Sequence, residues 1–268
     1  MIPVFIISMK NDLGRRQRIT EQLNKYNIPF TFIDAVVGKM LDKTSIEQID
    51  LSKVINRKKR NISLGEIGCS LSHVKVYSKI INNNIPYSLI LEDDVIFDDR
   101  LSEFVNSFKY SEHLFHESDL LILGGQNGID KSRFISRSFW SKIIVGGQLF
   151  SKTINSEKYI FRTCCYVVSF KMAKNLHDIF QSEFFIADEW SYFKEIGLIN
   201  DIFLSNFVDH PLDLRLSHIE QERLQSISIK SSTGSDGLMQ KVLNKYSFAA
   251  MFVQGCIRVR SFLRRFSL

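Results

Sequence analysis

Along most of the chain, short apolar runs alternate with segments whose apolar residues recur at helical spacing. Short apolar runs are typical of buried strands in a layered α/β protein. Stripes at helical spacing lie between the runs, for example Ile19, Leu23 and Tyr26 behind a cap at Asn11 or Asp12. The alternation therefore predicts an α/β layered domain. The predicted strands cover residues 3–8, 30–35, 88–91, 119–123, 160–169 and 202–208.

One predicted helix carries a polar face. It begins at Ser63-Leu64-Gly65-Glu66, a capping box with Glu66 at the third helical position. A solvent-facing surface is the simple interpretation of the polar face, but such surfaces usually carry more Lys and Glu, which favours a site. The apolar face, expected to pack on the sheet, is Ile67, Leu71, Val74, Ser78 and Ile81; the polar face is Glu66, Ser70, His73 and Tyr77.

Three carboxylates, Glu92, Asp93 and Asp94, follow directly on the apolar run at 88–91. Ligands of open α/β sheets bind outside the carboxyl ends of the strands. Carboxylates crowded there repel one another unless a cation lies among them, and oxygen ligands favour Mg²⁺ or Mn²⁺. Such a metal could bridge a diphosphate and neutralise a leaving nucleotide. An acidic turn at a strand end is the alternative interpretation.

Size and charge narrow the class of protein. The chain has 268 residues, of which 44% are hydrophobic and 24% charged, so it can bury a sizeable core. Its formal net charge of +6 suits an anionic partner, whether a nucleotide-sugar, a phosphorylated glycolipid, an acidic membrane or a nucleic acid. The basic segment at 39–62 is expected to be a solvated or mobile loop, or to rim an anionic site.

The four cysteines show neither C-x-x-C spacing nor a nearby His at zinc-ligand spacing, and we interpret them as reduced core thiols. The sequence contains no run of 18 apolar residues, and its N-terminus lacks the features of a signal peptide. The expected location is therefore the cytoplasm. The cysteines are Cys69, Cys164, Cys165 and Cys256.

The C-terminal segment, residues 236–268, is expected to form a separate amphipathic helical tail. From Gln240 onward it has six basic residues and no acidic one. An apolar side opposite a basic side is typical of a helix on anionic lipid. A basic helix docked on the core is the alternative. The apolar side is Phe252, Cys256, Val259, Leu263 and Phe266.

Several short motifs occur in a fixed order, and together they resemble glycosyltransferase family 25. This family contains bacterial lipooligosaccharide transferases related to the galactosyltransferase domains that modify collagen. The resemblance covers about residues 1–215 and is strongest before residue 95, whereas Cys164-Cys165 departs from the family's pattern. The motifs are Val4–Ser8, Arg15-Arg16, Phe32–Gly38, Leu64–His73 and Leu91–Asp94.

The resemblance implies an α/β, GT-A-like (Rossmann-related) nucleotide-sugar-binding domain over residues 1–235, with a mixed, mainly parallel central sheet flanked by helices. It also implies an inverting transfer of a hexose, most often galactose from UDP-galactose, to a lipooligosaccharide or lipopolysaccharide saccharide. Asp94 and Glu92 would bind Mn²⁺ or Mg²⁺. The expected UDP-sugar site is Ser8, Lys10, Arg15, Arg16, Asp34, Ala35, Glu66, His73, Glu92 and Asp93.

An inverting transfer needs a carboxylate base that lies apart from the metal. Asp188 and Glu189, expected in the first turn of a further helix, are the candidates, and we prefer Asp188. Simple capping of that helix is the alternative, because its dipole stabilises acidic side chains. Since the acceptor would be a growing lipooligosaccharide, the protein is expected to associate peripherally with the cytoplasmic face of the inner membrane.

Two other classes stay open. A metal-dependent nuclease or phosphohydrolase could use the same carboxylates, but it would usually need more clustered His and Asp. A non-catalytic basic protein that binds a membrane or nucleic acid would explain the charge, but not the acidic triplet. Nucleic-acid surfaces usually interleave basic and aromatic residues, whereas the Phe residues here occupy core-like positions, so no nucleic-acid partner is expected. Acceptor choice is expected to lie in loops 39–62, 125–158 and 211–235.

Overall fold

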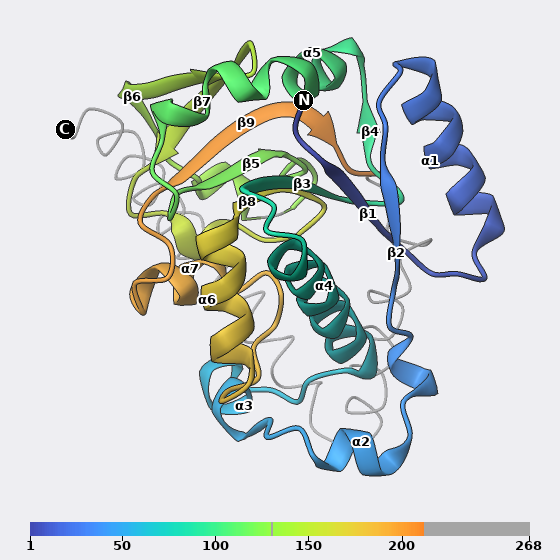
Figure 1. Cartoon of the computed structure of the whole chain (residues 1–268). Coiled ribbons are helices and arrows are strands. Elements are labelled where there is room, and N and C mark those ends of the chain that lie inside the picture. The colour runs from blue at the N-terminus through green and yellow to red at the C-terminus, as the bar shows by residue number, and fades with distance from the viewer. Residues whose placement is uncertain (130, 212–268) are drawn as a thin grey trace, which may run out of the picture.

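The computed structural model describes residues 1–129 and 131–211. Within these residues, nine strands form one sheet in the order β2-β1-β3-β8-β5-β9-β7-β6, with β4 paired to β9 (Figure 1). The strands are β1 (Val4–Ser8), β2 (Thr31–Asp34), β3 (Tyr87–Glu92), β4 (Ile96–Phe97), β5 (Leu120–Gly124), β6 (Arg137–Val145), β7 (Gln148–Thr153), β8 (Cys165–Ser169) and β9 (Ile202–Asp209). The α-helices are α1 (Leu13–Lys25), α2 (Lys43–Glu47), α3 (Ser52–Lys58), α4 (Leu64–Asn82), α5 (Asp99–Ser107), α6 (Phe170–Phe180) and α7 (Trp190–Glu195).

The strands β1, β2, β3, β5 and β9 run in the same direction. β1 pairs in parallel with both β2 and β3, and β5 pairs in parallel with β9. β8 lies antiparallel between β3 and β5, which gives β5 the direction of β3. The carboxyl ends of these strands therefore meet at one edge of the sheet. Ligands of α/β proteins bind at this kind of edge.

Helices cover both faces of the sheet, so the described part of the chain has three layers (Figure 1). One face packs against α1 and α5 through a core that includes Ile19 and Phe104. The other face packs against α4, α6 and α7 through residues that include Tyr77, Leu176 and Trp190. This architecture confirms the predicted α/β, GT-A-like class with a mixed sheet flanked by helices.

Parallel pairing is less common in the sheet than the sequence suggested. Three pairings are parallel and five are antiparallel. One cause is β8, which inserts between β3 and β5. The other is the β6–β7 hairpin within residues 125–158, a segment expected to be a loop. Its turn is Gly146-Gly147, where φ is 55° and 77°, the left-handed backbone that a tight hairpin turn needs.

Most of the predicted elements are confirmed. The apolar runs at 3–8, 30–35, 88–91, 119–123 and 202–208 correspond to β1, β2, β3, β5 and β9. Asp12 caps α1 by accepting the N–H of Arg15 at 3.1 Å. The run at 160–169 is a strand only from Cys165 onward. Residues before it include Arg162 with a φ of 67°, which a strand does not allow.

The orientation predicted for α4 is wrong in part. Its capping box is confirmed, with Ser63 and Glu66 bonded reciprocally. However, its polar side chains Ser70, His73 and Tyr77 are buried. The reason is that β8 supplies a polar partner, Tyr166, whose hydroxyl lies 2.8 Å from Nδ1 of His73 and 2.9 Å from the hydroxyl of Tyr77. The residues of the expected core face that are only partly buried are Leu71, Ser78 and Ile81.

The segment 39–62 is structured, so its prediction as a mobile loop is wrong. It begins within a 3-10 turn (Gly38–Met40) and contains α2 and α3. Val54 of α3 is fully buried in a small core with Ile67, Phe184 and Ile186. Full burial of one valine or isoleucine side chain contributes about 1.5–3 kcal/mol to the free energy of unfolding.

None of the helices in the described residues has the length and apolarity needed to cross a bilayer. The predicted tail at 236–268 and its boundary at residue 235 lie outside the described residues, and both stay predictions.

Candidate active site

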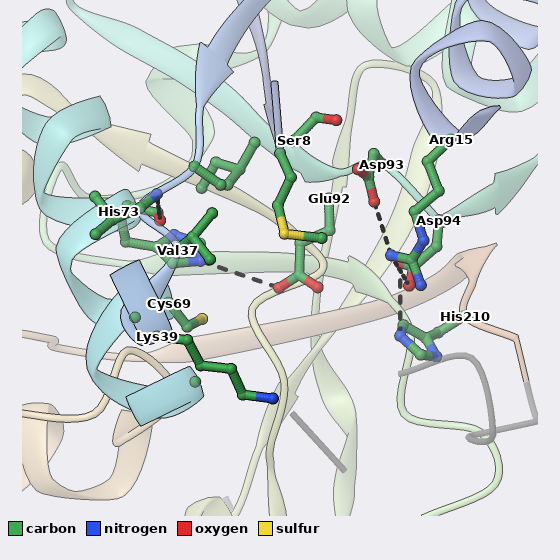
Figure 2. Close-up of a pocket in the computed structure, with 17 residues that line it drawn as sticks. Ser8, Arg15, Val37, Lys39, Cys69, His73, Glu92, Asp93, Asp94 and His210 are labelled. Atoms are coloured by element: carbon green, nitrogen blue, oxygen red, sulfur yellow. Dashed lines mark hydrogen bonds and ion pairs between the residues drawn. The ribbon is translucent and has the colours of Figure 1, made fainter. Parts of the chain in front are cut away.

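A cavity of about 300 Å³ opens at the carboxyl ends of β1, β2 and β3. Ser8 ends β1, Ala35 follows β2, and Glu92 ends β3. His73 of α4 and Arg15 of α1 complete part of the wall (Figure 2). The predicted site residues that line this cavity are Ser8, Arg15, Ala35, His73, Glu92, Asp93 and Asp94.

Close packing of backbone against α4 shapes one wall of the cavity. A Cβ on Gly38 would lie 1.7 Å from the carbonyl oxygen of Leu64, and one on Gly68 would lie 2.5 Å from that of Val36. Only glycine fits at such approaches. The Oγ of Ser72 accepts the N–H of Val36 at 2.8 Å, which fixes the strand-to-turn segment in place. Two of the motif glycines therefore shape the wall of the cavity.

Arg15 links two carboxylates of the triplet. Its Nη1 lies 2.9 Å from Oδ1 of Asp93 and 3.1 Å from Oδ2 of Asp94 (Figure 2). Burial raises the pKa of Asp93, and the charge and hydrogen bond of Arg15 oppose that rise. The guanidinium thus keeps two neighbouring carboxylates together, as charge-assisted bonds of this kind do.

Glu92 faces the cavity, and its pKa is raised. Its Oε1 accepts the hydroxyl of Thr163 at 2.7 Å. Burial, and next the negative charge of Asp94, raise the pKa of Glu92 to about 7. A cation would stabilise the charged form of this carboxylate, because it offsets both the burial and the repulsion by Asp94.

His210 brings an imidazole to the same place. It directly follows β9, and its Nε2 lies 3.6 Å from Oδ1 of Asp94. Its Nδ1 lies 2.9 Å from the carbonyl oxygen of Pro211. An Nδ1–H donated to that carbonyl would leave the Nε2 lone pair directed at Asp94. Burial lowers the pKa of His210, which favours the neutral form that can bind a metal.

Glu92, Asp94 and His210 form a candidate cation site. One ligand atom from each lies within 4.8 Å of the others. Oδ1 of Asp94 is buried and has no hydrogen-bond partner among the described residues. An orphaned buried carboxylate oxygen is costly unless something positive satisfies it. Two carboxylates and an imidazole are ligands that Mn²⁺ and Mg²⁺ accept, with open positions left for a substrate.

Four of the predicted donor residues lie elsewhere. Lys10 is exposed and does not line the cavity. Arg16 and Asp34 bond to each other at 2.5 Å, and Arg16 also holds the carbonyl of Ser8, so they brace the ends of β1 and β2. Glu66 is buried in its capping box and in an ion pair with Arg60 at 2.6 Å. Arg16, Asp34 and Glu66 support the scaffold, because their polar groups bond to other parts of it.

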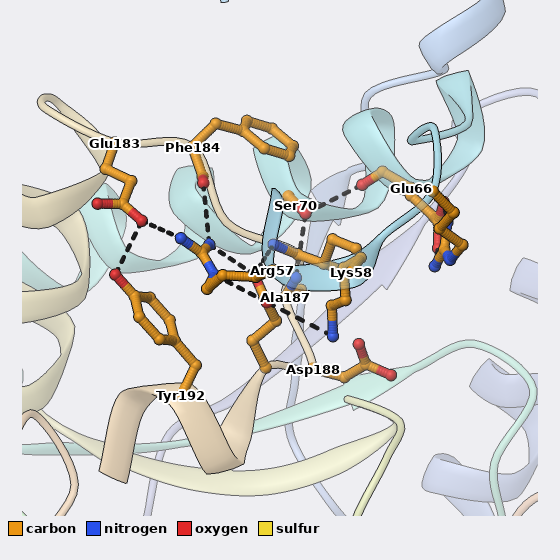
Figure 3. Close-up of polar contacts among 12 residues, drawn as sticks. Arg57, Lys58, Glu66, Ser70, Glu183, Phe184, Ala187, Asp188 and Tyr192 are labelled. Atoms are coloured by element: carbon orange, nitrogen blue, oxygen red, sulfur yellow. Dashed lines mark hydrogen bonds and ion pairs between the residues drawn. The ribbon is translucent and has the colours of Figure 1, made fainter. Parts of the chain in front are cut away.

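Asp188 and Glu189 have different environments. Figure 3 shows Asp188 together with Arg57 and Lys58, the two cations that pair with Glu189. Both precede α7 rather than lie in its first turn, so that expectation is wrong. Asp188 accepts the backbone N–H of Arg162 at 3.1 Å, and its charge contributes to the raised pKa of Glu92. Glu189 is buried and pairs with Arg57 at 3.0 Å and with Lys58 at 3.5 Å. Neither side chain lines the cavity, and the charges of Arg57 and Lys58 balance that of Glu189.

Arg57 holds α3 against the segment before α7. It pairs with Glu183 as well as Glu189, and its guanidinium lies 3.8 Å from the ring centroid of Tyr192. Replacing Arg57 with Met is expected to lower the free energy of unfolding by about 3 kcal/mol, because it leaves the buried Glu189 carboxylate short of a partner. Urea denaturation measures this change.

Arg100→Met is the matched control for that measurement. Arg100 pairs with Asp98 at 2.8 Å, and both side chains are 47% exposed. Its loss is expected to change stability by less than about 0.5 kcal/mol. Equal effects of the two substitutions would show that the Arg57 contacts contribute no more than a surface ion pair.

Sequence reasoning missed several residues of the site. His210 lines the cavity, Thr163 bonds to Glu92, and Tyr166 bonds to His73. Lys39 also lines the cavity, in agreement with the alternative that segment 39–62 rims an anionic site. A signal for His210 existed, since it follows the carboxyl end of a predicted strand just as Asp94 follows another. Thr163 and Tyr166 had no such signal, because their roles depend on where β8 inserts in the sheet.

The fold and the cavity define an α/β protein with an acidic ligand site at the carboxyl edge of its sheet. Comparison with protein families identifies the class: residues 1–190 match the model of "Glycosyltransferase family 25 (LPS biosynthesis protein)". Because this match covers more than half of the chain, the chain belongs to glycosyltransferase family 25. A nucleotide-sugar donor and a saccharide acceptor follow from membership of this family.

Individual relatives agree with the family assignment. A Haemophilus influenzae protein named provisionally as a glycosyltransferase is 24% identical over 90% of this chain and 83% of its own length. "Lipooligosaccharide biosynthesis protein lic2B" of Haemophilus influenzae is 29% identical over 44% of this chain and 43% of its own length. "Procollagen galactosyltransferase 1-B" of Xenopus laevis is 34% identical over 35% of this chain, a match that spans only 16% of that protein.

Proposed function

We propose that the chain transfers galactose from UDP-galactose, with inversion, to a saccharide of lipooligosaccharide or lipopolysaccharide, assisted by Mn²⁺ or Mg²⁺. The observation that carries the proposal is the convergence of Glu92, Asp94 and His210 within 4.8 Å on the wall of the cavity. The names of a procollagen galactosyltransferase and a lipooligosaccharide biosynthesis protein among the relatives support the choice of sugar and acceptor.

In this proposal, residues of the cavity bind the cation and offset the negative charge of UDP. Glu92, Asp94 and His210 would hold the cation, which supplies positive charge against the UDP that leaves as the anomeric bond breaks. Arg15 orients Asp93 and Asp94 through its two ion pairs. Lys39 extends along the cavity wall below Glu92, where its ammonium can approach a diphosphate (Figure 2).

Asp188 is the proposed base. It would accept the proton of the acceptor hydroxyl as that oxygen attacks the anomeric carbon from the face opposite to UDP. Asp188 does not line the cavity, but it lies near enough to Glu92 for its charge to contribute to the raised pKa of Glu92, which supports a place beside the donor site. Glu189, the other candidate, is less suitable because Arg57 and Lys58 neutralise it.

A donor screen tests the proposed function. Purified full-length protein is incubated with a panel of UDP-sugars and a truncated lipooligosaccharide acceptor, with Mn²⁺ and with a chelator. The expected result is transfer from UDP-galactose that the chelator abolishes. Transfer that persists in chelator would remove the metal from the proposal, and cleavage of oligonucleotides or phosphate esters instead of transfer would favour a metal-dependent hydrolase.

A second cavity supports an anionic acceptor. It measures about 400 Å³ and is lined by Arg133, Arg137 and Lys142, with no carboxylate among the described residues of its wall. Asn127 of its wall donates to Asp209 at 2.8 Å, and Asp209 directly precedes His210 of the first cavity. A saccharide that carries phosphate or carboxylate groups would fit its charge.

Replacing both Arg133 and Lys142 with Ala is expected to raise the KM for such an acceptor about tenfold, which corresponds to about 1.4 kcal/mol of lost binding. The KM for the donor should not change, because neither residue lines the first cavity. Steady-state kinetics with each substrate varied measures both constants. Lys171→Ala/Lys174→Ala on α6 removes the same charge elsewhere, and an equal effect there would show that only net charge matters.

Attachment to the cytoplasmic face of the inner membrane through residues 236–268 is also part of this proposal. The basic, apolar-sided sequence of that tail supports it.

A further inference from the structure

A second group of metal-ligating side chains lies on the wall of the same cavity. Cys69 and His73 are both on α4, and Glu92 ends β3. The Sγ of Cys69, a ring nitrogen of His73 and a carboxylate oxygen of Glu92 all lie within 4.8 Å of one another (Figure 2). The expectation that no His lies at zinc-ligand spacing is therefore wrong, since Cys69 and His73 are one helical turn apart and share a face.

His73 presents an unused ligand atom to this group. Its Nε2 is buried and has no hydrogen-bond partner among the described residues, and it lies 4.0 Å from Oε1 of Glu92. Its Nδ1 is 2.8 Å from the hydroxyl of Tyr166. If Nδ1 carries the hydrogen and donates it to Tyr166, the Nε2 lone pair faces Cys69 and Glu92. Metal-bound histidines are commonly oriented by such a bond on their second nitrogen.

The imidazole of His73 is buried, so water does not satisfy its Nε2. The unsatisfied nitrogen would otherwise be a cost to the fold. A bound cation would satisfy it.

The ligand set selects a thiophilic cation. Thiolate sulfur and imidazole nitrogen favour Zn²⁺ over Mg²⁺ or Mn²⁺. Tetrahedral zinc with bonds of about 2.0–2.3 Å places its ligand atoms about 3.3–3.8 Å apart. The 4.0 Å between His73 and Glu92 is therefore within a few tenths of an ångström of a binding geometry. Three protein ligands on a cavity wall leave the fourth position to water.

We propose that Cys69, His73 and Glu92 form a zinc site, and that zinc bound there inhibits transfer. Glu92 also belongs to the group with Asp94 and His210, so one carboxylate would serve two cation positions. Zinc would withdraw it from the catalytic position. On binding, the Cys69 thiol loses its proton to the solvent and the thiolate sulfur donates an electron pair to zinc. The inhibition rests on the proposed function, whereas the zinc site does not.

Spectroscopy with Co²⁺ in place of Zn²⁺ tests the site without any assay of activity. Full-length protein titrated with Co²⁺ is expected to develop the near-ultraviolet absorption of a cobalt–thiolate bond, and Zn²⁺ should displace it. Cys69→Ser should lack this band and should bind Zn²⁺ at least tenfold more weakly in competition with a chromophoric chelator. Cys164→Ala removes a different buried thiol and should keep both properties.

Two results would overturn the site: absence of the thiolate band in the unaltered protein, or equal zinc affinity in Cys69→Ser. Thermal melts without metal check that each variant is folded, and Cys69→Ala provides a second test if the serine variant is not. These results hold whether or not the protein transfers galactose.

The inhibition is then measured as the ratio of transfer rates with and without Zn²⁺ at fixed Mn²⁺. This ratio is expected to fall in the unaltered protein, to recover with excess Mn²⁺, and to change little in Cys69→Ser. Zinc binding with an unchanged ratio would overturn the sharing of Glu92. Zinc binding in a protein without any transferase activity would instead remove the proposed function and leave the site in place.

Discussion

Replacing Asp94 with Asn is expected to lower metal-dependent transfer by about 10³-fold, because a metal acting as a Lewis acid contributes several kcal/mol to such reactions. Oδ1 of Asp94 is buried, has no hydrogen-bond partner among the described residues, and lies with Glu92 and His210 in the candidate cation site. An amide has nearly the same size as the carboxylate but carries no charge. The variant should therefore fold and lose affinity for the cation.

The measurement is kcat at increasing Mn²⁺, with the Kd for Mn²⁺ determined separately in the absence of donor. Asp99→Asn is the matched control, since this substitution removes the same charge at an exposed position in the first turn of α5. The control should keep normal turnover. Near-normal turnover in Asp94→Asn at ordinary Mn²⁺ concentrations would remove Asp94 from the metal site.

The acidity of Glu92 adds a pH dependence to this prediction. Its pKa is raised to about 7, so below that pH a proton competes with the cation for the carboxylate. Affinity for Mn²⁺ should therefore weaken as the pH falls through 7 and level off above it. Asp94→Asn removes one cause of the raised pKa, so the remaining cation binding should weaken only at a lower pH.

The strands and the acidic triplet could be predicted because they are local features. An apolar run such as 88–91 specifies a buried strand, and in a parallel sheet its carboxyl end is where ligands bind. The cavity at Ser8, Ala35 and Glu92 follows from this rule. The capping box at Ser63 was equally local, since both of its partners lie within one helical turn.

Residues whose roles depend on distant partners could not be assigned in this way. Glu66 resembles a site residue by sequence, but Arg60 and the cap occupy its carboxylate. The sequence predicts that His73 and Tyr77 belong to a polar face, open to solvent or to a site, whereas the insertion of β8 places Tyr166 against them and buries all three. The antiparallel position of β8 is set by the whole sheet, which no local pattern specifies.

Glu189 shows the same limit for the choice of base. Two adjacent acidic residues look equivalent in a sequence, and both can cap a helix. The structure separates them, since Glu189 is buried between Arg57 and Lys58, whereas the carboxylate of Asp188 contacts only a backbone N–H among its hydrogen bonds in the described residues. The difference comes from α3, which lies about 130 residues earlier in the chain.

Replacing Asp188 with Asn is expected to lower kcat by about 10²–10⁴-fold, the range in which general bases contribute. An asparagine side chain can still accept the N–H of Arg162 through its oxygen, so the segment before α7 should keep its conformation. Affinity for UDP should remain, because Asp188 does not line the cavity. A base acts in the transition state, and its loss appears in the rate constant rather than in donor binding.

Isothermal titration with UDP and Mn²⁺, together with kcat for transfer, separates the two effects. Glu189→Gln is the matched control: it removes the neighbouring charge and should reduce stability more than turnover, because its partners are Arg57 and Lys58. A collapse of UDP affinity in Asp188→Asn would make Asp188 a donor ligand or a structural cap. Normal kcat in Asp188→Asn combined with a large loss in Glu189→Gln would transfer the role of base to Glu189 and require its ion pairs to open when the acceptor binds.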